Sequence, residues 1–258
     1  TNNEQMAIAI MSFYGLVFLF VIWKKKIHLY LPVVLAITFL NIVAMLLSPG
    51  NFAREAAEVK NWNPAFPSYT LLDKVEVGFG ATMHHFILNS SLLFLTLAIL
   101  VAMGIFYKYK ETGLRIMASI PVGVVLMLGF LGKFLLVLQA LGEGAGLRTV
   151  FRVVKENTVA FRAFDPTDLS TIIPLLLVLL VLGTLLYSIH KLFEDPWKSW
   201  EIFMVLGVGL MTRLLMGFSP TIFASGVRTF YILYLCMIYV TAVIFQEVST
   251  LHLNHRKK

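Results

Sequence analysis

The stretch Thr212–Thr229 holds the residues of this chain that are best suited to bind an anion. It places Arg213 inside an apolar segment, interrupts that segment at Ser219-Pro220, and offers Arg228 just before the next apolar run. A guanidinium stays charged and presents a planar fork of N–H donors that matches the oxygens of a phosphate. Because a charge within hydrocarbon is costly, Arg213 is expected to face a polar cavity or a partner.

Further polar side chains occur at the same boundary of the apolar segments as Arg213. The candidate substrate-binding residues at this boundary are Asn3, Asn51, Arg54, His84, His85, Lys133, Arg148, Arg152, Arg213 and Arg228. Structural roles stay open for several of them, such as helix capping for Asn3 and snorkelling to lipid headgroups for Lys133. Adjacent residues of a helix point about 100° apart, so His84 and His85 make a poor metal-binding pair.

Two carboxylates near this boundary are candidates for general-base catalysis. Glu4 opens the first apolar run, and Asp168 closes the segment Asp165-Pro166-Thr167-Asp168 ahead of another. Both carboxylates equally suit the N-terminus of a helix. The sequence shows no nucleotide-binding glycine loop, Ser/His/Asp signature or zinc pattern. No cofactor or metal site is therefore predicted, although a divalent metal stays an alternative.

Membrane helices must position these side chains. Apolar residues make up 59% of the chain and charged residues only 14%, against about 25% in soluble domains. Seven apolar runs approach the roughly 20 residues that a helix needs to cross a bilayer, namely 6–23, 29–47, 86–107, 116–138, 171–190, 202–218 and 229–248. They lack the alternation of barrel strands. The predicted fold is an all-α polytopic membrane protein with about seven transmembrane helices in one transmembrane domain, residues 1–258.

The positive net charge of +7 is placed where it sets membrane topology. Lysine and arginine gather in the short loops after the first, third and fifth runs and at the C-terminus, whereas the much longer loops carry them at a lower density. The positive-inside rule then predicts a cytoplasmic C-terminus and extracytoplasmic long loops, with no nucleic-acid partner. An outside N-terminus without a signal peptide predicts preceding spans, so we expect the C-terminal portion of a larger membrane protein.

Two segments of the long loops predict amphipathic helices at the outer membrane interface. These are Leu71–Phe86 and Leu147–Phe164, and the second carries Arg148 and Arg152 in a basic stripe beside its apolar side. A basic stripe at headgroup depth suits a lipid-linked phosphate. Docking on the helical bundle with solvated charges is the equal alternative.

Three short motifs carry a resemblance to a known group of proteins. The start T-N-N-E, the junction L-S-P-G-N-F-A-R and the segment G-F-S-P-T-I-F-A-S-G-V-R-T-F resemble an uncharacterised family of bacterial polytopic membrane proteins that is similar to serotype-converting glucosyltransferases of the GT-C type. The resemblance implies a sugar donor linked to polyprenyl phosphate and a surface glycan as acceptor. It further implies that Arg54 and Arg228 serve the donor phosphate or the acceptor, and that Asn3, Glu4 and Asn51 line the sugar pocket.

The function predicted on this basis is glycosyl transfer on the extracytoplasmic side of a cell membrane. Its partners are the bilayer, the polyprenyl-phosphate-linked sugar and the glycan acceptor. Two alternatives stay open. A transporter or flippase for a lipid-linked sugar would place polar groups near the bilayer midplane, and a polysaccharide polymerase or ligase would use outer arginines on a lipid pyrophosphate.

Overall fold

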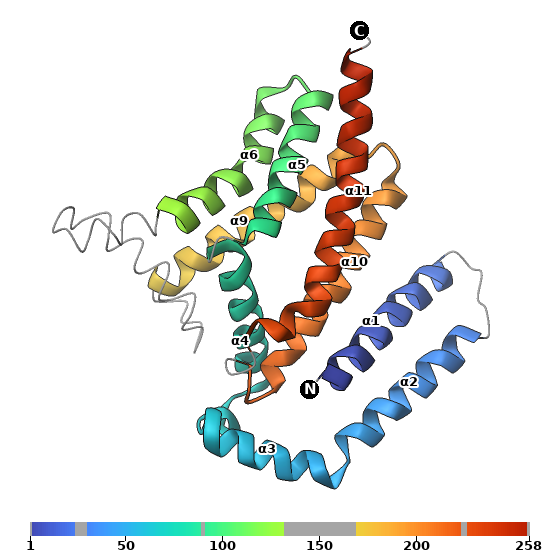
Figure 1. Cartoon of the computed structure of the whole chain (residues 1–258), viewed down its shortest axis with the longest axis vertical. Helices are drawn as coiled ribbons and strands as arrows, with labels where there is room; N and C mark the ends of the chain where they lie inside the picture. The colour runs from blue at the N-terminus through green and yellow to red at the C-terminus, as the bar shows by residue number, and fades with distance from the viewer. Residues whose placement is uncertain (1, 24–29, 89–90, 132–168, 223–225, 257–258) are drawn as a thin grey trace, which may run out of the picture. The chain divides into compact units, whose positions relative to one another are not determined.

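All regular secondary structure in the described part of this computed structural model is helical. The structure describes residues 2–23, 30–88, 91–131, 169–222 and 226–256. The main α-helices are α1 (Asn2–Trp23), α2 (Tyr30–Leu46), α3 (Pro49–Trp62), α4 (Leu71–Met83), α5 (Leu92–Lys108), α6 (Thr112–Leu126), α9 (Leu169–Leu192), α10 (Pro196–Leu214) and α11 (Tyr231–Arg256) (Figure 1). The predicted all-α class is confirmed.

Four helical stretches of the described residues are long and apolar enough to cross a membrane. They are Thr112–Gly129, Leu175–Leu192, Pro196–Phe218 and Gly226–Leu253, and a fifth arises if α4 and α5 form one broken span. The described residues therefore contain fewer membrane-spanning helices than the seven that were predicted. The described apolar parts of the first two runs, Ala9–Leu19 and Tyr30–Ala44, are shorter than the roughly 20 residues that a crossing requires.

The helices expose apolar side chains in a manner typical of lipid-facing surfaces. Leu176, Leu179 and Leu180 of α9 are each at least half exposed, and so are Ile238 and Phe245 of α11. In water such contiguous apolar surface would be a liability, whereas hydrocarbon solvates it well. Side-chain exposure thus agrees with helix length in indicating a membrane environment.

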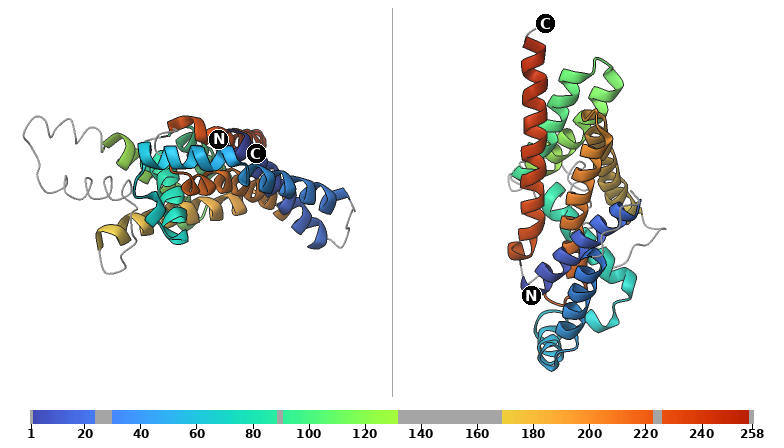
Figure 2. Two further views of the ribbon diagram at one scale, coloured as in Figure 1. Left: turned by 90° about the horizontal axis from the view of Figure 1, so that it is seen from below. Right: turned by 90° about the vertical axis from the view of Figure 1, so that its right-hand side faces the viewer.

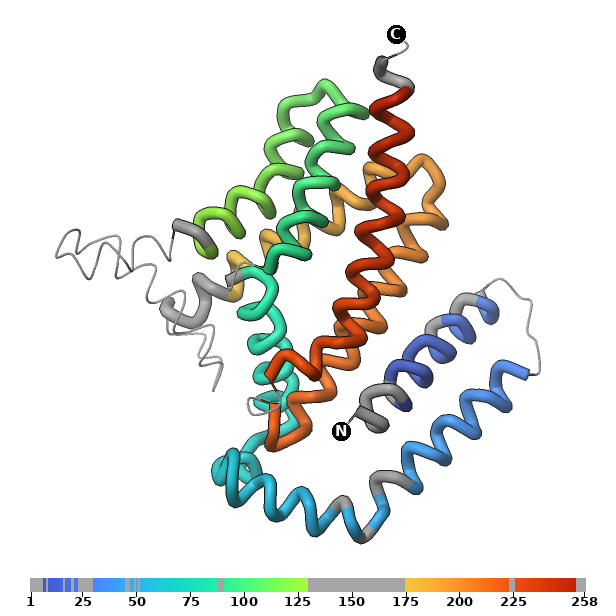
Figure 3. The backbone as a smooth tube through the Cα atoms, viewed as in Figure 1, coloured from blue at the N-terminus to red at the C-terminus, as the bar shows by residue number. Residues whose placement is uncertain are grey.

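The chain divides into two compact units, and each is described separately. Unit 1 comprises residues 1–78 and 203–236, and unit 2 comprises 79–202 and 237–258. In unit 1, α1 and α2 pack side by side as a hairpin. The larger part of α10 continues through the 3-10 helix η4 (Leu215–Phe218), and a second 3-10 helix, η5 (Gly226–Phe230), leads into α11 (Figure 3).

Unit 2 is built on a hairpin of α5 and α6 with α9 packed against both helices (Figures 1 and 2). The buried residues of α9 recur at helical spacing, at Val178, Val181, Leu185, Ile189 and Leu192. A π-helix, η2 (His84–Leu88), precedes α5, and a second, η3 (Met127–Leu131), follows α6.

A local sequence signal explains where α4 begins. Thr70 and Asp73 form reciprocal hydrogen bonds at the start of α4, where the Asp73 carboxylate accepts from the Thr70 amide at 2.7 Å and the Asp73 amide donates to the Thr70 hydroxyl at 3.2 Å. A helix predicted over 71–86 is confirmed as α4.

Helix α3 lies in a part of the first long loop for which no helix was predicted. Pro49 occupies its first turn, where proline removes no helix hydrogen bond, and the Ala-Arg-Glu-Ala-Ala-Glu run that follows is rich in strong helix formers. The Arg54–Glu58 pair adds an ion pair one turn apart. The turn-rich Asn61–Pro64 segment only ends this helix.

Candidate functional site

Arg213 is the largest fully buried side chain in the described structure, with 1% of its surface exposed. It lies in the last turn of α10, directly before the backbone tightens into η4. Ser219 then adopts an extended conformation, with φ −113° and ψ 132°, because the residue before proline avoids the helical region. The predicted break at Ser219-Pro220 is confirmed, and it leaves Arg213 at the helix end.

Two residues of the segment that leads into α11 hold the guanidinium. Arg213 donates a hydrogen bond from Nη1 to the hydroxyl of Thr229, and Thr229 in turn donates to the Gly226 carbonyl at 3.0 Å. The Phe230 ring stacks on the guanidinium, with its centroid 3.7 Å from Cζ. A cation over an aromatic face is stabilised by the ring quadrupole, most strongly where water is excluded.

The charge of Arg213 is incompletely compensated. Its Nε is buried and has no hydrogen-bond partner among the described residues. No carboxylate of the described ranges forms an ion pair with it. A guanidinium offers five N–H donors in one plane, and the Nε donor of Arg213 remains for an anionic acceptor.

Hydroxyl groups order the turn after η4. The Ser219 and Thr221 side-chain oxygens lie 2.9 Å apart, and the Thr221 amide donates to the Ser219 oxygen at 3.4 Å. The Ile222 amide closes the turn on the Ser219 carbonyl at 3.3 Å. Local hydrogen bonds of this kind stabilise a tight turn after a helix.

Glycines let α4 press directly on the end of α10. A Cβ at Gly78 would lie 2.5 Å from the Leu214 carbonyl oxygen, and one at Gly217 would overlap the Lys74 carbonyl. Only glycine permits backbones to approach this closely. The Leu214 carbonyl, which directly follows Arg213 in the chain, is thereby held against α4.

Close packing also fixes α10 against α11. A Cβ at Gly209 would lie 2.8 Å from the Leu233 side chain and 3.1 Å from the Cβ of Cys236. The two elements that contribute Arg213, Thr229 and Phe230 are therefore held together independently of the polar contacts.

The other arginines predicted at this site have different surroundings. Arg54 lies on α3, is exposed, and forms an ion pair with Glu58 at 3.5 Å. Arg228 is exposed and directly precedes the two residues that contact Arg213. Of the predicted arginines, Arg213 is the one that the described structure buries.

The remaining candidates lie in other parts of the chain. His84 and His85 are half-buried in the π-helix η2, and His85 meets the Phe86 ring edge-on at 5.2 Å. The backbones of Asn3 and Glu4 belong to α1 and that of Asn51 to α3, while their side chains are outside the description. Outside the described residues lie Lys133, Arg148, Arg152 and Asp168, as does the predicted basic helix 147–164.

Sequence reasoning missed the roles of Thr229 and Phe230. Both lie sixteen or more residues from Arg213, so no local pattern of the sequence signals their contact with it. Within the described ranges, no group of three or more His, Cys, Asp or Glu side chains is arranged to hold a metal ion.

Comparisons of the chain with known protein families, with curated proteins and with solved structures find no match. The chemistry of the site therefore has to carry the functional assignment. What the site offers is a fixed, buried cation that is stacked on an aromatic ring and whose Nε has no hydrogen-bond partner among the described residues, and such a group is suited to hold an anion.

Proposed function

We propose that this chain forms the core of a multi-pass membrane glycosyltransferase in which Arg213 binds the phosphate of a polyprenyl-phosphate-linked sugar. The observation that supports it is the buried Arg213 guanidinium, whose Nε lacks a hydrogen-bond partner among the described residues. In this proposal seven helices cross the membrane, the C-terminus is cytoplasmic and the acceptor is a surface glycan.

The site suits a lipid-linked phosphodiester in charge and in polarity. A phosphodiester carries one negative charge, which would balance the one uncompensated guanidinium charge. Its oxygens can take the N–H donors of the arginine fork in parallel. The prenyl chain is apolar and would extend along lipid-facing helix surfaces, such as those of α11.

Arg213 would contribute to the rate as well as to binding. When the bond between the sugar and the phosphate breaks, negative charge develops on the departing polyprenyl phosphate. A fixed cation in a water-poor site stabilises that charge more than it stabilises the bound donor. The Phe230 stack and the Thr229 hydrogen bond would keep the fork in one orientation throughout.

The acceptor hydroxyl needs a base, and the contacts of Arg213 include no carboxylate within the described residues. Glu4 and Asp168 keep their place as the proposed candidates, with neither side chain in the described part. Arg213 is thus the residue proposed to bind the phosphate, whereas no single residue is assigned as the base.

A flippase or transporter of lipid-linked sugars is the second candidate. Interrupted helices are frequent in transporters, and the described chain holds the 3-10 segment η4 after α10 and the π-helix η2 before α5. Both functions would use Arg213 to hold a lipid phosphate, but only the transferase makes a glycosidic bond.

The test is glycosyl transfer in proteoliposomes that contain the purified protein, a polyprenyl-phosphate sugar donor and extracted surface glycan. Arg213→Gln should lower kcat/KM about 100-fold, as expected when a donor to the developing charge is lost. Lys60→Gln removes a cation from the exposed last turn of α3 and should retain wild-type transfer. Equal transfer by folded wild type and Arg213→Gln would refute the proposal, and donor translocation without a new glycosidic bond would establish the transporter instead.

A further inference from the structure

Unit 2 contains a second site with a charged side chain, an open cavity of about 460 Å³ beside the turn that joins α5 to α6. Cavities of about 300–1,000 Å³ accommodate small ligands or parts of larger ones. We name it the Arg115 cavity, after the charged residue of its lining. The lining residues are Phe106, Thr112, Arg115, Ile116, Ser119 and Ile120. None of them takes part in the Arg213 site.

The end of α5 fixes the Arg115 guanidinium. Arg115 donates from Nε to the Tyr109 carbonyl at 2.8 Å and from Nη2 to the Phe106 carbonyl at 3.1 Å. Its Cζ lies 5.2 Å from the centroid of the Phe106 ring, which adds a cation–π contact. Carbonyls at the end of a helix have no partner within the helix, so the arginine satisfies them and is itself held in one orientation.

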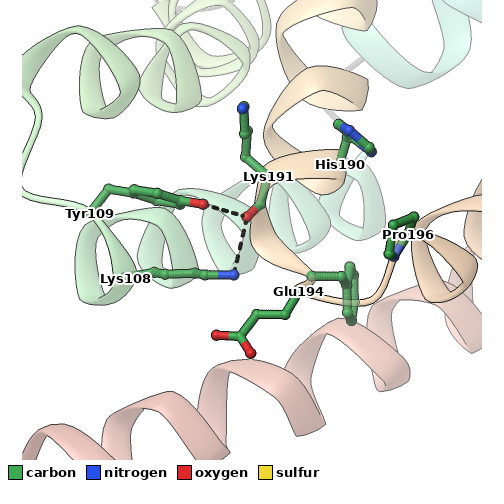
Figure 4. A pocket seen from close by; sticks show the side chains of 7 residues that line it. Lys108, Tyr109, His190, Lys191, Glu194 and Pro196 are labelled. Atoms are coloured by element: carbon green, nitrogen blue, oxygen red, sulfur yellow. Dashed lines mark hydrogen bonds between the residues drawn. The ribbon is translucent and has the colours of Figure 1, made fainter.

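The same end of α5 is anchored to α9 by other side chains. Lys108 donates from Nζ to the carbonyls of Leu192 and Lys191, at 2.9 and 3.3 Å. The Tyr109 hydroxyl donates to the Lys191 carbonyl at 3.1 Å (Figure 4). Lys108 is thereby committed to the end of α9. The carbonyls that orient Arg115 therefore belong to a helix end that is already held in place before any ligand arrives.

Arg115 keeps donors for an anion after these contacts. Its Nη1 forms no hydrogen bond with a described residue, and no carboxylate of the described ranges forms an ion pair with it. Thr112, the first residue of α6, adds a hydroxyl that also has no hydrogen-bond partner in the part of the chain that the structure describes. The Ser119 hydroxyl is used by the Arg115 carbonyl, at 2.8 Å. Guanidinium and hydroxyl donors of this kind suit the oxygens of a phosphate.

The rest of the lining is mainly apolar and follows one face of α6. Thr112, Ile116 and Ile120 recur every four residues, which places them on the same side of the helix. Ile116 is 60% exposed, as expected of a side chain that meets lipid. The membrane-crossing stretch Thr112–Gly129 begins three residues before Arg115, so the guanidinium belongs about 4.5 Å along the axis from its start, at headgroup depth. Polar groups thus lie at the membrane boundary and apolar ones further in.

We infer that the Arg115 cavity binds an anionic glycerophospholipid. Its phosphate accepts hydrogen bonds from Arg115 and Thr112, and one of its acyl chains continues along Ile116. The phosphate of any phospholipid can accept from these donors, but an ammonium headgroup would bring a second cation to a lining that has no carboxylate. Glu111, which precedes α6, is exposed and does not line the cavity. The α5–α6 loop is one of those predicted to be cytoplasmic, and the cytoplasmic leaflet carries anionic lipids.

The experiment measures binding of single lipids to the purified full chain by native mass spectrometry, with phosphatidylglycerol and phosphatidylcholine of matched acyl chains. Wild type should prefer phosphatidylglycerol about fivefold, as expected for one arginine that meets an anionic lipid. Arg115→Gln should abolish that preference. Lys110→Gln makes the same charge change at an exposed position outside the cavity and should keep it. Thr112→Val leaves the contacts of Arg115 intact and should weaken both lipids about fivefold, the size of one hydrogen bond.

Equal loss of preference in Arg115→Gln and Lys110→Gln would show a general attraction of the basic loop and would overturn the inference. Because Arg115 also holds the end of α5, circular dichroism checks the fold of its variant, and Thr112→Val decides alone if that variant unfolds. Wild-type binding of both lipids by Thr112→Val would then count against the site. Soluble glycerol phosphate should fail to displace the lipid, and displacement by it would show that no acyl chain is bound. Because the cavity does not involve Arg213, each result leaves the transferase proposal to its own test.

Discussion

Replacing Thr229 by valine removes one hydroxyl and keeps the shape of the side chain. That hydroxyl accepts the hydrogen bond from Arg213 and donates to the Gly226 carbonyl. Thr229→Val therefore leaves a buried guanidinium donor and a backbone carbonyl without this partner. The matched control is Thr212→Val, because Thr212 is equally buried and its hydroxyl bonds only to the Gly209 carbonyl of its own helix, at 2.7 Å.

The two changes should differ clearly in free energy of unfolding. A hydrogen bond to a charged group contributes about 1.5–3 kcal/mol, and a neutral hydrogen bond between membrane helices contributes about 0.6 kcal/mol. Thr229→Val loses the hydrogen bond from the charged guanidinium and a neutral bond within η5, so about 2 kcal/mol or more is expected. Thr212→Val loses only a bond within one helix turn and should cost about 0.6 kcal/mol or less.

The assay is reversible unfolding of the purified protein in mixed detergent micelles, followed by tryptophan fluorescence and circular dichroism. The predicted gap of about 1.5 kcal/mol corresponds to slightly more than tenfold in the unfolding equilibrium. Equal stability of the two variants would show that the Thr229 hydroxyl does not support Arg213. The description of the site as a buried guanidinium held from η5 would then be wrong.

Two further substitutions test the packing and the helix ends. Gly217→Ala should destabilise unit 1 by about 1–3 kcal/mol, because its Cβ would overlap the Lys74 carbonyl. The control Gly207→Ala meets nothing within 4 Å and should be neutral or stabilising. The unfolding midpoints of the two variants are compared, and equal shifts would contradict the close approach of α4. Lys108→Met should lower the free energy of unfolding by about 1–2 kcal/mol, because it leaves the last carbonyls of α9 without their hydrogen-bond donor. Amide exchange should become faster at that helix end alone. Lys110→Met, at an exposed position, is the control.

Element types follow readily from this sequence because the apolar runs are long. Runs near 20 residues have few alternatives to a membrane helix, and X-Pro steps such as Ser219-Pro220 end helices through local sterics. Span counts are less determined: α1 and α2 coincide closely with the apolar runs 6–23 and 29–47, yet their described apolar stretches fall short of a full crossing. Helix α3 was missed because its Ser-Pro-Gly-Asn opening is also typical of a turn.

The candidate site could likewise be predicted only in part from the sequence. Arg213 could be singled out from the sequence, because a charge in an apolar run is rare and costly. Its partners Thr229 and Phe230 could not, because the contact depends on how α10 and α11 pack around Gly209, and one sequence does not encode that packing in a readable pattern. Arg54, assigned to the phosphate by resemblance, has its ion-pair partner on its own helix.

The most direct measurement of the central claim is the affinity of the purified protein for a short-chain polyprenyl phosphate sugar, determined by titration in micelles. Wild type should bind it, Arg213→Lys should bind about tenfold more weakly because it loses the planar fork, and Arg213→Gln should bind more weakly still. Lys60→Gln should bind as the wild type does. Unchanged affinity in folded Arg213→Gln would show that Arg213 does not hold the donor phosphate.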